Sequence, residues 1–151
     1  MSEGIRTLLV AAGAIGAALC FQSIKTSTIP VSSPERLVAE LRLAQIAALL
    51  LTLSAGAYIG FAATSDGRTG IGVDIALAAG FFVLCAYTMI CDPRQALTLL
   101  ALGFAAHAII DVGHRPGVLP DGVAPSWYAV GCASYDVFIG AVCYLPILRR
   151  R

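Results

Sequence analysis

Residues 93–116 read PRQALTLLALGFAAHAIIDVGHRP, and this stretch decides the fold class of the chain. A proline directly after Asp92 is typical of a helix N-terminus. The stretch ends at Arg115–Pro116, where the residue before a proline is disfavoured in helical conformation. The roughly 20 residues between these signals would span about 30 Å as a helix, the thickness of the hydrocarbon core of a bilayer. The pattern therefore predicts a membrane-spanning helix over residues 93–113.

The composition of the whole chain favours the same class. Of the 151 residues, 58% are hydrophobic and 13% are charged, and the mean hydropathy is +0.84. Soluble domains are nearer half apolar and a quarter charged. The net charge of +1 and the lack of a basic stripe give no reason to expect nucleic acid as a partner. We therefore expect an integral membrane protein whose main partner is the lipid bilayer.

Four further apolar segments have the length of a membrane span. They cover about residues 5–24, 34–64, 70–91 and 126–148. The first segment is not followed by the small-residue site at which a cleavable signal is cut, so we expect it to be retained as a helix. Together with residues 93–113 these segments predict a single all-α membrane domain over residues 1–151, a bundle of five transmembrane helices. Almost no loop separates residues 70–91 from 93–113, which predicts a tight antiparallel hairpin.

The second segment begins at Ser33–Pro34, a cap followed by a proline at the first helical position. About 30 helical residues would span roughly 45 Å, more than the hydrocarbon core. We therefore expect the first two turns of this helix to project into water. Their charged residues are Glu35, Arg36, Glu40 and Arg42.

Five spans place the termini on opposite sides of the membrane. One side then carries Lys25, Arg36, Arg42, Arg94, Arg149, Arg150 and Arg151, and the other carries Arg6, Arg68 and Arg115. The positive-inside rule favours an N-out, C-in orientation. We expect a multi-pass protein of a bacterial-type inner (plasma) membrane. The small residues of the first segment would suit close helix packing, including packing between copies of the chain in a homo-oligomer.

Ionisable residues gather near one end of this predicted bundle. His107, Asp111 and His114 fall within an arc of about 60° on one helix, because successive residues are about 100° apart. Asp74 and Asp136 should reach the same outer half from neighbouring helices. A carboxylate at the membrane centre costs about 2.5–3.5 kcal/mol on insertion scales, so such a cluster suggests a polar pocket. The loop over residues 115–125 has three prolines and should cover this end.

A metal centre is the first hypothesis for this cluster. His107, Asp111, His114, Asp136 and Asp74 are the candidate ligands, an N/O set suited to Zn, Fe or Mn. His107 and His114 lie about 10.5 Å apart along the helix axis, so one ion shared by both would need strongly converging side chains. Haem is not expected, because both histidines lie on one helix. The five cysteines contain no C-x-x-C pair and are interpreted as small buried apolar side chains.

Three other interpretations stay open. His107, Asp111 and Asp136 could be the catalytic residues of a metal-free acid–base enzyme. The substrate of this enzyme, or of a metal-dependent enzyme that uses the same site, would be a hydrophobic, lipid-like molecule that arrives from the outer leaflet. The cluster could instead fix helix packing in a non-enzymatic membrane subunit or small-ligand binder. A proton-linked transporter is the last interpretation, although titratable groups are sparse in the inner half.

Overall fold

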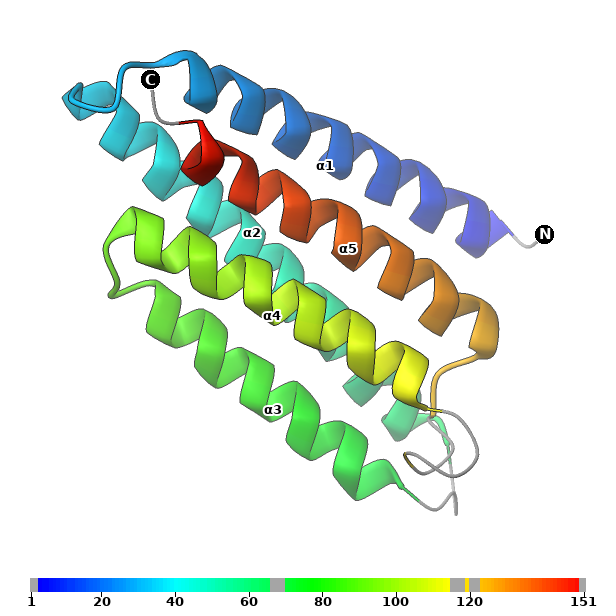
Figure 1. Ribbon diagram of the computed structural model, residues 1–151. Helices are drawn as coiled ribbons and strands as arrows, with labels where there is room; N and C mark the ends of the chain where they lie inside the picture. Colours follow the sequence, from blue (N-terminus) through cyan, green and yellow to red (C-terminus); the bar gives the residue numbers. More distant parts are fainter. Residues whose placement is uncertain (1–2, 66–69, 115–118, 120–122, 150–151) are drawn as a thin grey trace.

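The computed structural model describes residues 3–65, 70–114, 119 and 123–149 (Figure 1). These residues form the helices α1 (Glu3–Thr28), α2 (Pro34–Ala63), α3 (Ile71–Thr88), α4 (Pro93–Gly113) and α5 (Ser126–Leu148). Each of them is long and apolar enough to cross a membrane. The predicted all-helical fold with five candidate spans is confirmed, and the N-out, C-in orientation stays a prediction.

Two helix starts are set by the predicted caps. The Ser33 side chain accepts a hydrogen bond from the backbone N–H of Glu35, and Asp92 accepts from the N–H groups of Arg94 and Gln95. These bonds satisfy amide groups that have no partner in the first turn of a helix. Helix α3 ends at Thr88 rather than near residue 91. The N–H groups of residues 89–91 bond to carbonyls three residues earlier, a tighter turn that leads directly into α4.

The five helices pack side by side with alternating direction. Helix α1 lies against α5 and α2, and α3 lies against α2 and α4 (Figure 1). We call one end of the bundle the site end; it contains the starts of α1, α3 and α5 and the ends of α2 and α4. We call the opposite end, where Arg36 contacts the ends of α1 and α5, the arginine end. Helix α1 reaches it at Thr28, beyond the predicted limit near Ile24.

Apolar side chains fill the bundle between the two ends. Its fully buried members include Leu51, Leu97, Leu100, Phe104, Ile139 and Cys143. Gly140 lets α5 approach α4 closely, because a Cβ atom there would lie 3.3 Å from the Ala101 carbonyl oxygen. This close contact lies one turn from Asp136 and therefore fixes the two helices that carry most of the candidate site.

The expectation that the first two turns of α2 project into water is wrong for two of its four charged residues. Arg36 and Glu40 are each only 1% exposed, whereas Glu35 and Arg42 are exposed. The Arg36 Nε donates to Glu40 Oε1 at 2.5 Å, and its two Nη atoms donate to backbone carbonyls of α1, the α1–α2 connection and α5. A guanidinium group carries five donors, so it can hold several helix ends together at once.

A proline within α5 explains one further buried contact. Pro146 has no N–H group, which leaves the carbonyl of Val142 without its usual partner in the helix. The Ser23 hydroxyl of α1 donates to that carbonyl at 2.7 Å. The predicted turn after Ser65 and most of the predicted cover over residues 115–125 lie outside the described residues.

Candidate functional site

Four side chains of types that can ligate a metal ion come together at the site end. His107 and Asp111 lie one turn apart on α4, and Cys132 and Asp136 lie one turn apart on α5. Each supplies one donor atom, and these four atoms lie within 4.8 Å of one another. His107, Asp111 and Asp136 are buried and Cys132 is half-buried. Their donor atoms are close enough together to hold one metal ion, and we call these four residues the metal-binding group.

The contacts within the metal-binding group centre on the His107 ring. Its Nδ1 lies 2.7 Å from Asp136 Oδ2 and 3.6 Å from Asp111 Oδ2. The Cys132 Sγ lies 3.7 Å from Asp136 Oδ2. The two carboxylates therefore approach the same imidazole nitrogen from two different helices.

Two carboxylate oxygens in this group have no hydrogen-bond partner within the described residues. They are Asp111 Oδ2 and Asp136 Oδ1, and both are fully buried. Buried polar atoms normally have partners, and those that do not often mark a functional site or an ion. His107 is the ion-pair partner that the described part of the chain offers to either carboxylate.

Tyr58 of α2 supports the group from a third helix. Its hydroxyl donates a short hydrogen bond to Asp111 Oδ1, which leaves Oδ2 directed at His107. The Tyr58 ring meets the His107 ring edge-on at a centroid distance of 5.8 Å and stacks on the His114 ring at 5.9 Å. Tyr58 thus lies between the two histidines.

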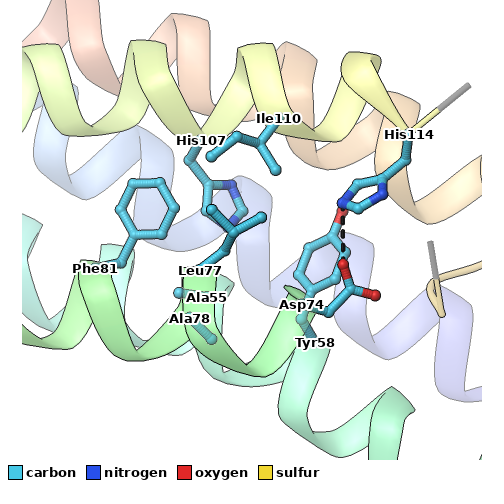
Figure 2. A pocket seen from close by; sticks show the side chains of 9 residues that line it. All are labelled: Ala55, Tyr58, Asp74, Leu77, Ala78, Phe81, His107, Ile110 and His114. Carbon is cyan, nitrogen blue, oxygen red and sulfur yellow. Dashed lines mark ion pairs between the residues drawn. The ribbon is translucent and has the colours of Figure 1, made fainter. Parts of the chain in front are cut away.

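Asp74 and His114 form a separate pair nearer the end of the bundle. The His114 Nε2 lies 3.1 Å from Asp74 Oδ1, and both side chains are buried. The backbone N–H of Val123 donates to the other oxygen, Asp74 Oδ2, at 3.1 Å. Figure 2 shows this pair on one side of a small cavity and the His107 ring on another. The cavity has room for about one water molecule.

The structure brings together three of the five predicted site residues, namely His107, Asp111 and Asp136. The other two, His114 and Asp74, pair with each other across the cavity. This separation agrees with the distance along α4 that argued against one ion shared by both histidines. Sequence analysis missed Cys132 and Tyr58. Cys132 could have been found from its i, i+4 spacing to Asp136, which places both on one face of α5.

The donor set restricts the metals that the group could hold. One imidazole nitrogen, one sulfur and two carboxylate oxygens suit Zn²⁺ or Fe²⁺, whereas the sulfur makes Mn²⁺ a poorer match. Donor atoms around a tetrahedral Zn²⁺ lie about 3.3–3.8 Å apart for metal–ligand distances of 2.0–2.3 Å. The contacts of 2.7–3.7 Å and the limit of 4.8 Å bracket that separation.

Comparisons with protein-family models, curated proteins and solved structures give no match for this chain.

Proposed function

We propose that this protein binds one divalent metal ion within the membrane through His107, Asp111, Cys132 and Asp136, and that Zn²⁺ fits best. The observation that carries the proposal is the pair of buried carboxylate oxygens, Asp111 Oδ2 and Asp136 Oδ1, that have no hydrogen-bond partner in the described part of the chain. Both belong to residues whose donor atoms already gather within 4.8 Å of a histidine and a cysteine. A cation at the centre of the four donor atoms would give each of them a partner.

The charges of the group support a divalent ion. Two ionised carboxylates carry a charge of −2, and a protonated His107 reduces it only to −1. A divalent ion bound to two carboxylates and a neutral imidazole gives a neutral set. Isolated charge is costly in a low-dielectric interior, so the neutral set is favoured. Cys132 is the fourth donor; once its thiol releases its proton on binding, the complete set carries a charge of −1, which is no more than the metal-free group carries with a protonated His107.

The packing below the site argues against a proton-linked transporter. Fully buried apolar residues separate Asp136 and His107 from the arginine end, among them Phe104, Leu100 and Ile139. Within the described residues, the polar groups of the two ends therefore do not form a continuous path.

We place the site end at the outer face of the membrane. Among the described residues, five Lys and Arg residues lie on the side of the arginine end and one, Arg6, on the side of the site end, and the positive-inside rule puts the arginine end in the cytoplasm; the five are Lys25, Arg36, Arg42, Arg94 and Arg149. The proposal predicts that a membrane-impermeant thiol reagent labels a single-cysteine variant carrying Ser126→Cys from outside, and one carrying Arg149→Cys only after permeabilisation. The reverse labelling pattern would refute it.

A second candidate function is an enzyme that acts on a lipid-like substrate at the same site. It is favoured by the 2.7 Å contact between His107 Nδ1 and Asp136 Oδ2, which is the geometry of a general base and the carboxylate that orients it. His107 and Tyr58 also line the cavity, so the polar end of a substrate could contact them there. A bound Zn²⁺ would add Lewis-acid polarisation of a carbonyl or phosphoryl oxygen.

Metal content is the direct test of the metal-binding proposal. Protein purified in mild detergent, loaded with Zn²⁺ and passed through a desalting column should retain about one zinc per chain by elemental analysis. His107→Ala and Asp136→Asn should each abolish retention. Loading with Co²⁺ should give a thiolate charge-transfer absorption that Cys132→Ser removes and the matched control Cys91→Ser preserves.

The outcomes separate the candidates. Retained metal that is lost in the His107 and Asp136 variants supports the metal centre. No retained metal in a folded wild-type protein overturns it and leaves the metal-free enzyme and the structural interpretation. The structural interpretation then requires that Asp136→Asn lowers the melting temperature, and an unchanged melting temperature overturns that interpretation.

A further inference from the structure

His107, Asp111 and Asp136 are buried and Cys132 is half-buried, so an ion must pass between protein side chains to reach the metal-binding group. His107 and Asp136 are at most 2% exposed, and an apolar layer lies between them and the arginine end. The cavity beside His107 extends in the other direction, toward the site end. It is lined by Tyr58, Asp74 and His114 as well as by His107, with Ala78 on the α3 side (Figure 2).

We propose that Asp74 and His114 form a second, transient cation site through which a divalent metal ion passes to the metal-binding group. This inference rests on the proposed metal-binding function. The pair offers one carboxylate and one imidazole at 3.1 Å from each other, both buried. Apart from this ion-pair contact with His114, Asp74 Oδ1 has no hydrogen-bond partner within the described residues, although Asp74 is only 2% exposed and lines the cavity.

The number of donors predicts that Asp74 and His114 bind a metal ion more weakly than the metal-binding group does. Asp74 and His114 supply two donors, whereas the metal-binding group supplies four. Structural zinc sites normally use four protein ligands, so an ion held by two would keep water and exchange readily. An ion therefore gains ligands as it moves from Asp74 and His114 to the metal-binding group.

Tyr58 lies along the path between the two sites. Its ring stacks on His114, contacts His107 edge-on, and its hydroxyl bonds to Asp111. A cation that leaves the pair therefore passes along the Tyr58 side chain, whose hydroxyl bonds to Asp111, a proposed ligand of the metal-binding group. The small size of the cavity favours a metal ion with few waters over an organic molecule.

Uptake and release kinetics test the route separately from binding itself. Chelator-treated protein in detergent is mixed with Co²⁺, and the absorption of the bound ion is followed over time; release is followed after adding excess chelator. Asp74→Asn keeps an oxygen acceptor for the Val123 N–H and removes the charge. It should slow uptake about tenfold or more, because a charged cleft raises cation on-rates by about 10 to 10³-fold.

A residue that lies on the route of the ion changes the rates of Co²⁺ uptake and release and leaves the dissociation constant unchanged. Release from Asp74→Asn should therefore slow in proportion, with unchanged affinity and one ion bound per chain. Ala78→Leu, which fills the cavity without changing charge, should slow both rates as well. Ala79→Leu is the matched control, since Ala79 is the exposed neighbour on the same helix, and it should behave as wild type.

Two results would overturn the route. Wild-type kinetics in both Asp74→Asn and Ala78→Leu would show that ions reach the group elsewhere. A loss of affinity in Asp74→Asn with unchanged uptake would make Asp74 a permanent ligand instead. Failure of the proposed function is recognised independently, as wild-type protein that binds no Co²⁺ at equilibrium.

Discussion

Replacing Tyr58 with phenylalanine probes the metal centre without touching a proposed ligand. The change removes one oxygen atom and keeps the ring that packs against both histidines. The Tyr58 hydroxyl donates to Asp111 Oδ1 and so orients the other oxygen toward His107. Without that bond, the Asp111 carboxylate is freer to turn and to take up a proton, which a metal ion would have to displace.

The contact and the burial of Asp111 set the size of the expected effect through general values for such bonds. A hydrogen bond to a charged group is worth about 1.5–3 kcal/mol, and its loss here falls on a fully buried carboxylate. Loss of a partner that orients a metal ligand commonly weakens metal binding by about 10- to 100-fold. This factor corresponds to about 1.4–2.8 kcal/mol, because each 1.4 kcal/mol is tenfold. We therefore expect Tyr58→Phe to raise the Zn²⁺ dissociation constant by 10- to 100-fold.

The assay is a competition titration of Zn²⁺ between the detergent-solubilised protein and a chromogenic chelator. Tyr144→Phe is the matched control, because Tyr144 is exposed on the same bundle and lies away from the group. Melting curves with and without Zn²⁺ separate stability from affinity. A Tyr58→Phe protein that melts lower without metal, yet binds Zn²⁺ within about threefold of wild type, would refute the reasoning. Asp111 would then be a packing residue held by a tyrosine and not a ligand.

The remaining predictions concern stability and are measured by thermal or denaturant unfolding in detergent. Removing bound Zn²⁺ with a chelator should lower the free energy of unfolding by about 2.7 kcal/mol relative to protein held at a hundredfold excess over the dissociation constant; no shift would contradict metal binding. Ser23→Ala should lower the free energy of unfolding by about 1–3 kcal/mol, because it leaves the Val142 carbonyl without a hydrogen bond. Most of this loss should vanish in a Pro146→Ala background, because residue 146 then has an N–H group that can donate to that carbonyl. Equal costs in both backgrounds would show that Ser23 acts in another way. Gly103→Ala should lower the free energy of unfolding by about 1–3 kcal/mol, because its Cβ would lie 2.8 Å from a methyl carbon of Leu84. Gly80→Ala should be tolerated, because no atom lies within 4 Å of the Cβ position there. Equal effects of the two substitutions would contradict this packing.

The helices could be predicted from the sequence because each signal is local. Apolar runs of membrane length and the caps Ser33 and Asp92 are properties of consecutive residues. The end of α3 was predicted less well. Its last turn tightens over residues 89–91 to meet the cap of α4, and that adjustment depends on where the next helix begins.

The site could be predicted only in part, because a single helix face shows which residues align but not what lies opposite. The spacing of His107 and Asp111 placed them on one stripe, and the depth of Asp136 placed it at the same level. Whether Asp74 joins this group or pairs with His114 depends on the rotation of α3 about its own axis. No local pattern sets that rotation, so the split into a deep group and an outer pair emerged only from the structure.

The error at Arg36 and Glu40 has a related physical origin. Length alone suggested that a helix of about 30 residues must extend into water. The chain instead buries this charged turn against the ends of α1 and α5, where unpaired carbonyls of helix termini and a bend offer acceptors. An arginine satisfies several such acceptors at once, and a sequence read one helix at a time does not reveal that they converge.

The two ends of the bundle together explain why the unpartnered oxygens at the site end point to a ligand. At the arginine end, the buried Arg36 donates to Glu40 and to three backbone carbonyls, so this small fold can satisfy a buried charge in full. At the site end, Asp111 and Asp136 share a single imidazole nitrogen and each keeps one oxygen without a hydrogen bond in the described part of the chain. Imperfect packing would scatter such atoms, whereas these two lie in one group with a thiol and a histidine. Replacing a buried ion pair as a whole with apolar residues is often neutral or stabilising, so packing alone does not require these charged groups. Keeping both carboxylates on facing helices is explained if a cation binds between them.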